Sequence, residues 1–141
     1  MKGYLYLQTH PEHPGLVRFL IAERSPDLDR ADAGAAIRYI ARFNDIDAAR
    51  MHVQNALHRR LIDLDARMYR TGLAEAIAVV EADNLSHERI WIDPELDAQT
   101  LQRVEQLTAQ GRARIRRWDR AWQTVGYFFL AFLALRALGL I

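Results

Sequence analysis

Residues 3–22 read GYLYLQTHPEHPGLVRFLIA, and this stretch decides the fold class. Residues 3–8 alternate aromatic and aliphatic side chains, and residues 16–22 form a second apolar run. Both patterns are typical of β-strands. Two prolines and a glycine lie between the runs, at Pro11, Pro14 and Gly15, where they favour a turn. The stretch therefore predicts a β-hairpin.

The residues that follow predict one more strand and several helices. AIRYIARF at 36–43 alternates in the same way, although residues 35–41 also fit a helix. Start signals and apolar spacing predict helices over 26–33, 48–62, 73–83 and 94–122. Residues 67–70 fit a short extended segment, and 89–92 a short apolar link. The predicted fold class is α+β: a small three-stranded antiparallel sheet flanked by helices, then a long helix and a C-terminal anchor.

The anchor is predicted from residues 111–141, GRARIRRWDRAWQTVGYFFLAFLALRALGLI. The order basic, aromatic, apolar is typical of a cytoplasmic flank that enters a bilayer. As a helix, residues 124–141 would span roughly 27 Å at about 1.5 Å per residue, close to the ~30 Å hydrocarbon core. We therefore expect a single C-terminal transmembrane helix. The side chains expected at the membrane interface are Arg112, Arg114, Arg116, Arg117, Trp118, Arg120 and Trp122.

Arg136 is the one charged residue in the apolar run. The strongly apolar residues around it contribute about −0.3 to −0.6 kcal/mol each to insertion, against roughly +2.5 to +3.5 kcal/mol for one arginine at mid-bilayer. The sum favours insertion, with Arg136 facing a partner subunit inside the membrane beside Gly126, Phe129 and Phe132. Two alternatives remain open: a buried C-terminal helix of a soluble protein, and a helix lying on a membrane surface.

Three segments follow from these patterns. Residues 1–92 are expected to form the α+β domain, 93–122 an amphipathic stalk helix with a basic flank, and 123–141 the anchor. The first residues lack the apolar core of a signal peptide. The sequence therefore predicts a tail-anchored, single-pass protein of the inner or cytoplasmic membrane, with its N-terminal domain in the cytoplasm.

Charge and composition exclude several functions. Residues 1–110 carry 13 Lys/Arg and 17 Asp/Glu, net −4, whereas residues 111–141 carry 6 Arg and 1 Asp, net +5. An acidic domain argues against nucleic acid as a partner, and the basic tail favours membrane lipid. The chain has no cysteine, which excludes thiolate metal sites. No phosphate loop, Ser-His-Asp set or dinucleotide fingerprint is present, so we expect no cofactor and no small-molecule substrate.

Three sequence segments carry a family resemblance. GYLYLQTHPEHPGLVRFLIAERSPDL, DIDAARMHVQNALHRRL and ARMYRTGLAEAIAVVE follow one another over residues 3–82. Together they resemble the phage-type branch of the GIY-YIG endonuclease superfamily. The resemblance implies a nuclease-like fold. It places Tyr6 on the tyrosine of the first half-motif, Arg24 on the arginine that contacts the scissile phosphate, and His58 on the histidine of the following helix.

Two positions depart from the family pattern. Leu20 stands where the second half-motif has glycine, and Arg67 where the family has the glutamate that holds a divalent cation. Arg18 stands where this branch usually has lysine. Hydrolysis of this kind needs the cation, and a fixed positive charge repels it. We therefore expect a degenerate domain with no catalytic residues and no metal, although Asp65 is an alternative ligand.

The function expected from the sequence is that of a non-catalytic, membrane-anchored accessory or scaffold subunit in a larger membrane complex. Its expected partners are membrane lipid and integral membrane protein subunits. The alternative is a metal-dependent GIY-YIG endonuclease, tethered or soluble, that uses Tyr6, Arg24 and His58.

Overall fold

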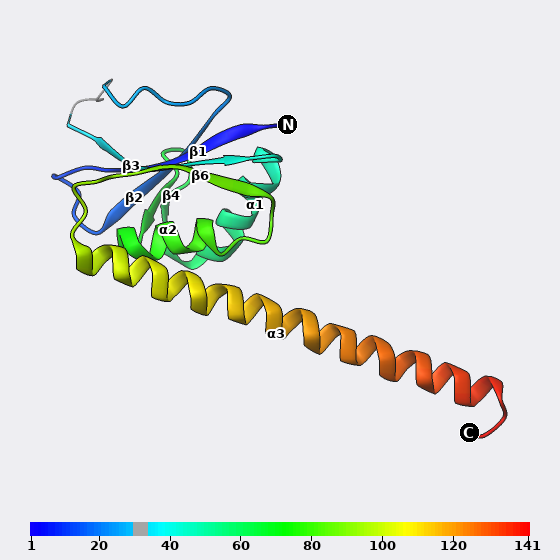
Figure 1. Cartoon of the computed structure of the whole chain (residues 1–141). Coiled ribbons are helices and arrows are strands. Elements are labelled where there is room, and N and C mark those ends of the chain that lie inside the picture. Colours follow the sequence, from blue (N-terminus) through cyan, green and yellow to red (C-terminus); the bar gives the residue numbers. More distant parts are fainter. Residues whose placement is uncertain (30–33) are drawn as a thin grey trace.

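The computed structural model describes residues 1–29 and 34–141, which form an α+β domain from which a long helix projects (Figure 1). In chain order the elements are β1 (Gly3–Thr9), β2 (Leu16–Ala22), β3 (Ala36–Phe43), α1 (Ile46–Leu57), the 3₁₀ turn η1 (His58–Arg60), β4 (Leu61–Asp63), β5 (Met68–Arg70), α2 (Leu73–Glu81), β6 (His87–Ile92) and α3 (Ala98–Ala137).

The strands make one antiparallel sheet. Within the described residues it has six strands in the order β4-β5-β2-β1-β3-β6. The predicted hairpin is present as β1 and β2, with Tyr6 paired to Leu20, and β3 covers the predicted third strand. Alternation places Leu5 and Leu7 in the core, whereas Tyr4 and Tyr6 on the opposite face are half-buried.

Helices α1 and α2 cover one face of the sheet, and the first half of α3 packs on the outside of α2 (Figure 1). The core between these layers includes Tyr39 and Phe43 from β3, Ile77 from α2 and Val104 from α3, all less than 2 % exposed. Asp45 caps α1 by accepting a hydrogen bond from the Ala48 N–H. The sheet and its helices thus share one apolar core, to which α3 belongs through its first turns.

The membrane anchor predicted at residues 123–141 is wrong. No helix in the described part of the chain is long and apolar enough to cross a membrane. The reason is where α3 ends: Leu138 is its C-cap, and Gly139 turns the chain with a φ of +70°. The apolar part of the helix, from Val125 to Ala137, therefore spans only about 20 Å at ~1.5 Å per residue, well short of ~30 Å.

Two expectations that depended on the anchor are also wrong. These are the tail-anchored topology and the single-pass localisation in the inner or cytoplasmic membrane with the domain in the cytoplasm. The membrane-interface role expected of Arg112, Arg114, Arg116, Arg117, Trp118, Arg120 and Trp122 stays a prediction. Arg136 lies in the last turn of α3, beside the helix end, and not inside a membrane span.

The sheet and two helices also differ from the prediction. Six strands replace the expected three, because β4, β5 and β6 extend the sheet at its two edges. The helix predicted over 48–62 ends at Leu57, and the one predicted from Pro94 begins at Ala98, where Asp97 is the N-cap. Residues 26–29 are not helical, and 30–33 of that predicted helix lie outside the described residues.

Gly111 allows α3 to approach α2 closely. A Cβ atom at Gly111 would lie 2.8 Å from the Cβ of Ala82, a contact that neither helix can relieve by turning a flexible side chain. Gly126, on the same helix, has nothing within 4 Å of its Cβ position. The two glycines therefore form a matched pair for testing how α3 is held.

We expect Gly111→Val to lower the free energy of unfolding by about 1–3 kcal/mol, because the added side chain forces α3 away from α2. Gly126→Val should change it by less than about 0.5 kcal/mol, since a surface substitution without contacts has little effect. Urea denaturation followed by tryptophan fluorescence measures both values. Equal effects at the two positions would contradict this account of how α3 packs.

Candidate functional site

The second half of α3, from Arg116 to Ala137, is exposed to solvent, and we call it the bare half. Its contact with the domain ends near Ile115, which is half-buried, and every residue from Arg116 to Ile141 is exposed. The exposed fraction of the large apolar side chains in this part reaches 74 % at Phe128. They are Trp118, Trp122, Val125, Tyr127, Phe128, Phe129, Leu130, Phe132, Leu133, Leu135, Leu138, Leu140 and Ile141. A continuous apolar surface of this kind marks an interaction site.

A buried carboxylate connects the bare helix to the domain. Glu81, at the end of α2, is only 7 % exposed. Tyr39 donates its hydroxyl hydrogen to Glu81 Oε1 at 2.9 Å, and Arg89 donates to both carboxylate oxygens. Arg89 also reaches Glu105 on α3 at 3.3 Å, and Arg112 donates to the main-chain oxygen of Glu81 at 3.2 Å. Side chains from β3, β6 and α3 therefore converge on one residue of α2.

The electrostatics of Glu81 follow from these contacts. Burial raises the pKa of its carboxyl group, but hydrogen bonds from Arg89 and Tyr39 and the charges of Arg89 and Arg112 outweigh burial, so the pKa lies below its usual value of 4.5. Burial and the neighbouring carboxylate raise the pKa of Tyr39. The hydrogen bond to Glu81 likewise raises the pKa of Arg89. Glu81 is thus ionised and paired at neutral pH.

A groove lies where α1, α2 and α3 meet, beside the point at which α3 leaves the domain. Its free volume is about 540 Å³. Its apolar lining includes Val79, Leu107 and Ile115. At its rim the His52 ring approaches the Asp83 carboxylate at 3.0 Å. The groove therefore offers an apolar floor with a polar edge at the base of the bare helix.

The residues named by the nuclease resemblance do not come together. Tyr6 lies on the sheet face opposite the helices, with Leu20 and Ile40 as its cross-strand neighbours. Arg24 is exposed just beyond β2. His58 lies in η1 after α1, and its ring contacts the Asn55 carbonyl oxygen at 2.9 Å. Tyr6 is therefore separated from His58 by the sheet.

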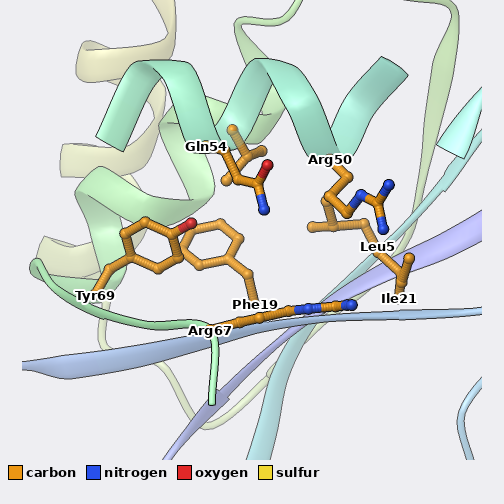
Figure 2. Close-up of a pocket in the computed structure, with 8 residues that line it drawn as sticks. Leu5, Phe19, Ile21, Arg50, Gln54, Arg67 and Tyr69 are labelled. Atoms are coloured by element: carbon orange, nitrogen blue, oxygen red, sulfur yellow. The ribbon is translucent and has the colours of Figure 1, made fainter. Parts of the chain in front are cut away.

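Arg67, at the expected metal position, lies on the helix side of the sheet. It lines a small space with Leu5, Phe19 and Ile21, beneath Arg50 and Gln54 of α1 (Figure 2). The free volume there is about 10 Å³, which holds one water molecule at most. Because neighbouring residues of a strand point to opposite faces, Tyr6 cannot reach a space lined by Leu5.

The turn between β4 and β5 fixes the conformation of Arg67. Its φ is +53°, in the left-handed region that non-glycine residues rarely adopt. The Phe19 N–H donates to its carbonyl oxygen at 3.1 Å, and Asp63 accepts from the Asp65 and Ala66 N–H groups. Asp65, the alternative metal ligand, is exposed in this turn. No group of three His, Cys, Asp or Glu side chains that could hold a metal ion occurs among the described residues.

Sequence reasoning named the arginines and tryptophans of α3, among them Arg112, but missed Glu81 and Arg89, which hold α3 in place together with Arg112. The signal for Glu81 was an acid four residues after Ile77, on the apolar side of LAEAIAVVEAD. An acid at such a position needs a buried partner. The partner could not be identified, because Arg89 lies in a segment interpreted as a link.

The chain matches no family model, no curated protein and no solved structure. The resemblance to GIY-YIG nucleases therefore stays a prediction from the sequence.

The Glu81 pairing should make stability depend on pH. A carboxyl group whose pKa is lowered by folding stabilises the protein above its unfolded pKa, and this contribution is lost as pH falls through the folded value. At pH 7 we expect Glu81→Gln to lower the free energy of unfolding by about 1–3 kcal/mol. Urea denaturation should show this gap shrinking below about pH 4.5.

Glu88→Gln is the matched control. Glu88 lies on the same strand as Arg89 and pairs with Arg42 at 2.7 Å, but both side chains are exposed. The effect of this substitution should stay below about 1 kcal/mol. A Glu81→Gln gap that is as large at pH 3 as at pH 7 would show that the carboxylate charge is not what matters.

Proposed function

We propose that this chain is a non-catalytic assembly subunit, which uses the bare half of α3 to pack against apolar surfaces of partner proteins in a larger complex. One observation carries the proposal: from Val125 on, large apolar side chains lie on all sides of this helix and remain 42–74 % exposed. A helix that is apolar all round is normally buried. Leaving this much apolar area in water costs roughly 25 cal/mol per Å², so a covering partner gains substantial free energy.

The connection between domain and helix supports a scaffold role. α3 runs without a break from Ala98 to Ala137, through the boundary expected between stalk and anchor. The Glu81 contacts and the close approach at Gly111 hold its first half against the domain. From Arg116 to Ala137 the helix extends about 33 Å at ~1.5 Å per residue. A partner bound there would hold the domain at a set distance and direction.

The placement of the nuclease-like residues supports a non-catalytic domain. A phosphodiesterase needs its phosphate ligands and its cation site around one substrate position. Tyr6 lies on one face of the sheet, and Arg67, at the position of the expected cation ligand, lies on the other. The acidic balance of residues 1–110 also argues against a nucleic-acid substrate.

Site-specific photocrosslinking tests the assembly role. A photoreactive amino acid at Phe128, which is 74 % exposed, should give adducts with another protein in cells that produce this chain. The same group at Met51, which is 57 % exposed on α1, is the matched control and should give none or far fewer. If Phe128 yields no adduct with another protein, or no more than Met51, α3 does not assemble with a partner protein.

A nicking assay tests the absence of catalysis. The purified full chain, Tyr6→Phe and Arg24→Ala should all leave supercoiled plasmid intact in Mg²⁺ or Mn²⁺, at the level of buffer alone. Nicking by the unaltered chain that is lost in Arg24→Ala would establish the nuclease instead. His58→Ala would then show whether the histidine takes part.

A further inference from the structure

The bare half of α3 carries a stripe with the spacing of a helical seam. Residues 115, 119, 122, 126, 129, 133 and 136 follow one another in alternating steps of four and three, which places them on one side of the helix. The stripe begins at Ile115, where contact with the domain ends, and its remaining side chains are exposed. It contains Asp119, the one acidic residue of 111–141, and Arg136, the one charge of 124–141.

We infer that this stripe pairs with the same stripe of a second copy of the chain, with the two helices antiparallel. The inference rests on the proposed role of α3 as an assembly helix and names one of its partners. When the two-fold axis passes between residues 127 and 128, Asp119 lies opposite the partner's Arg136. Trp122 then lies opposite the partner's Leu133, and Gly126 opposite the partner's Phe129. Each contact occurs twice, as a two-fold interface requires.

Charge complementarity selects this arrangement. Neither Asp119 nor Arg136 forms an ion pair within residues 1–29 and 34–141. Antiparallel pairing joins them at both ends of the seam. A parallel pair would instead bring two clusters of Arg112–Arg120 side by side, and like charges at that distance repel. In the antiparallel pair the negative end of each helix dipole, near Ala137, lies beside the partner's arginine cluster.

The position at which α3 ends fits the same antiparallel register. Ala137, the last residue of α3, lies opposite the partner's Trp118, just before the point where the partner's domain begins to cover its own helix. A longer helix would run into that domain. The chain turns at Gly139 and brings Leu138–Ile141 level with residues 114–117 of the partner. Two of those partner residues, Arg114 and Ile115, line the end of the groove between α1, α2 and α3.

Charge reversal tests the pairing on the full chain. Sedimentation velocity should show a dimer. Asp119→Arg and Arg136→Asp should each raise its dissociation constant about tenfold, because each places two like-charge contacts in the seam. The double variant Asp119→Arg/Arg136→Asp should return to within about threefold of the unaltered chain. Arg59→Asp, which is exposed in η1 and lies outside α3, is the matched control and should behave as the unaltered chain.

Single cysteines determine the direction, since the chain has none of its own. A mixture of Trp122→Cys and Leu133→Cys chains should oxidise to a mixed disulfide far faster than either chain alone. Self-crosslinking of each variant without the mixed product would show a parallel pair and overturn the inference. A monomer at all concentrations, or a double variant no better than the single ones, would overturn it as well.

These outcomes are separable from the assembly role. Adducts of Phe128 with another protein that persist in Arg136→Asp, combined with a monomeric chain, would leave the proposed function intact and refute self-pairing. A dimer combined with no such adduct would leave self-pairing intact and refute assembly with another protein.

Discussion

The carboxylate of Glu81 sets the geometry of the molecule. An ionised side chain that is 7 % exposed is stable only if donors surround it, and those donors come from different elements. Tyr39 supplies one from β3, and Arg89 supplies two from β6. Arg89 extends the network to Glu105 of α3. Because all these groups must meet at one point, the positions of the edge strand and of α3 relative to α2 are coupled, and the direction in which the bare helix leaves the domain follows from them.

The fold was predictable where side chains alternate or follow apolar spacing. Leu5 and Leu7 against Tyr4 and Tyr6, and the run at 36–43, indicated β1, β2 and β3 because their inward side chains are apolar. β6 was not predicted, because its position opposite Ala41 of β3 is the charged Arg89, and only the ion pair with Glu81 explains a charge there. β4 and β5 are three residues each, too short to show a period, although the extended segment expected at 67–70 coincides with β5. Local patterns thus gave the centre of the sheet, and nonlocal pairing gave its edges.

The candidate site shows the same division. The apolar and basic character of residues 111–141 was evident from composition, and the continuity of α3 followed from its spacing. The predicted membrane span was wrong because residues 124–141 were taken as one apolar helix, whereas the helix ends at Ala137. A helix end depends on cap geometry, here the turn at Gly139 with its φ of +70°, and a single glycine among leucines is a weak signal for it. Similarly, Tyr6 and Arg67 share a motif order in sequence, but strand parity places them on opposite faces.

A helix that is apolar on every side needs more than one neighbour, and the two proposed partners divide its surface. The seam through Trp122, Gly126 and Phe129 accounts for one side, which leaves Phe128 and Leu135 on the other. In an antiparallel pair these uncovered sides lie on opposite outer surfaces and are related by the two-fold axis, with one domain at each end of the rod. A partner that binds one outer side would therefore find an equivalent site on the other. The chain would then connect two copies of that partner at a spacing set by the length of α3.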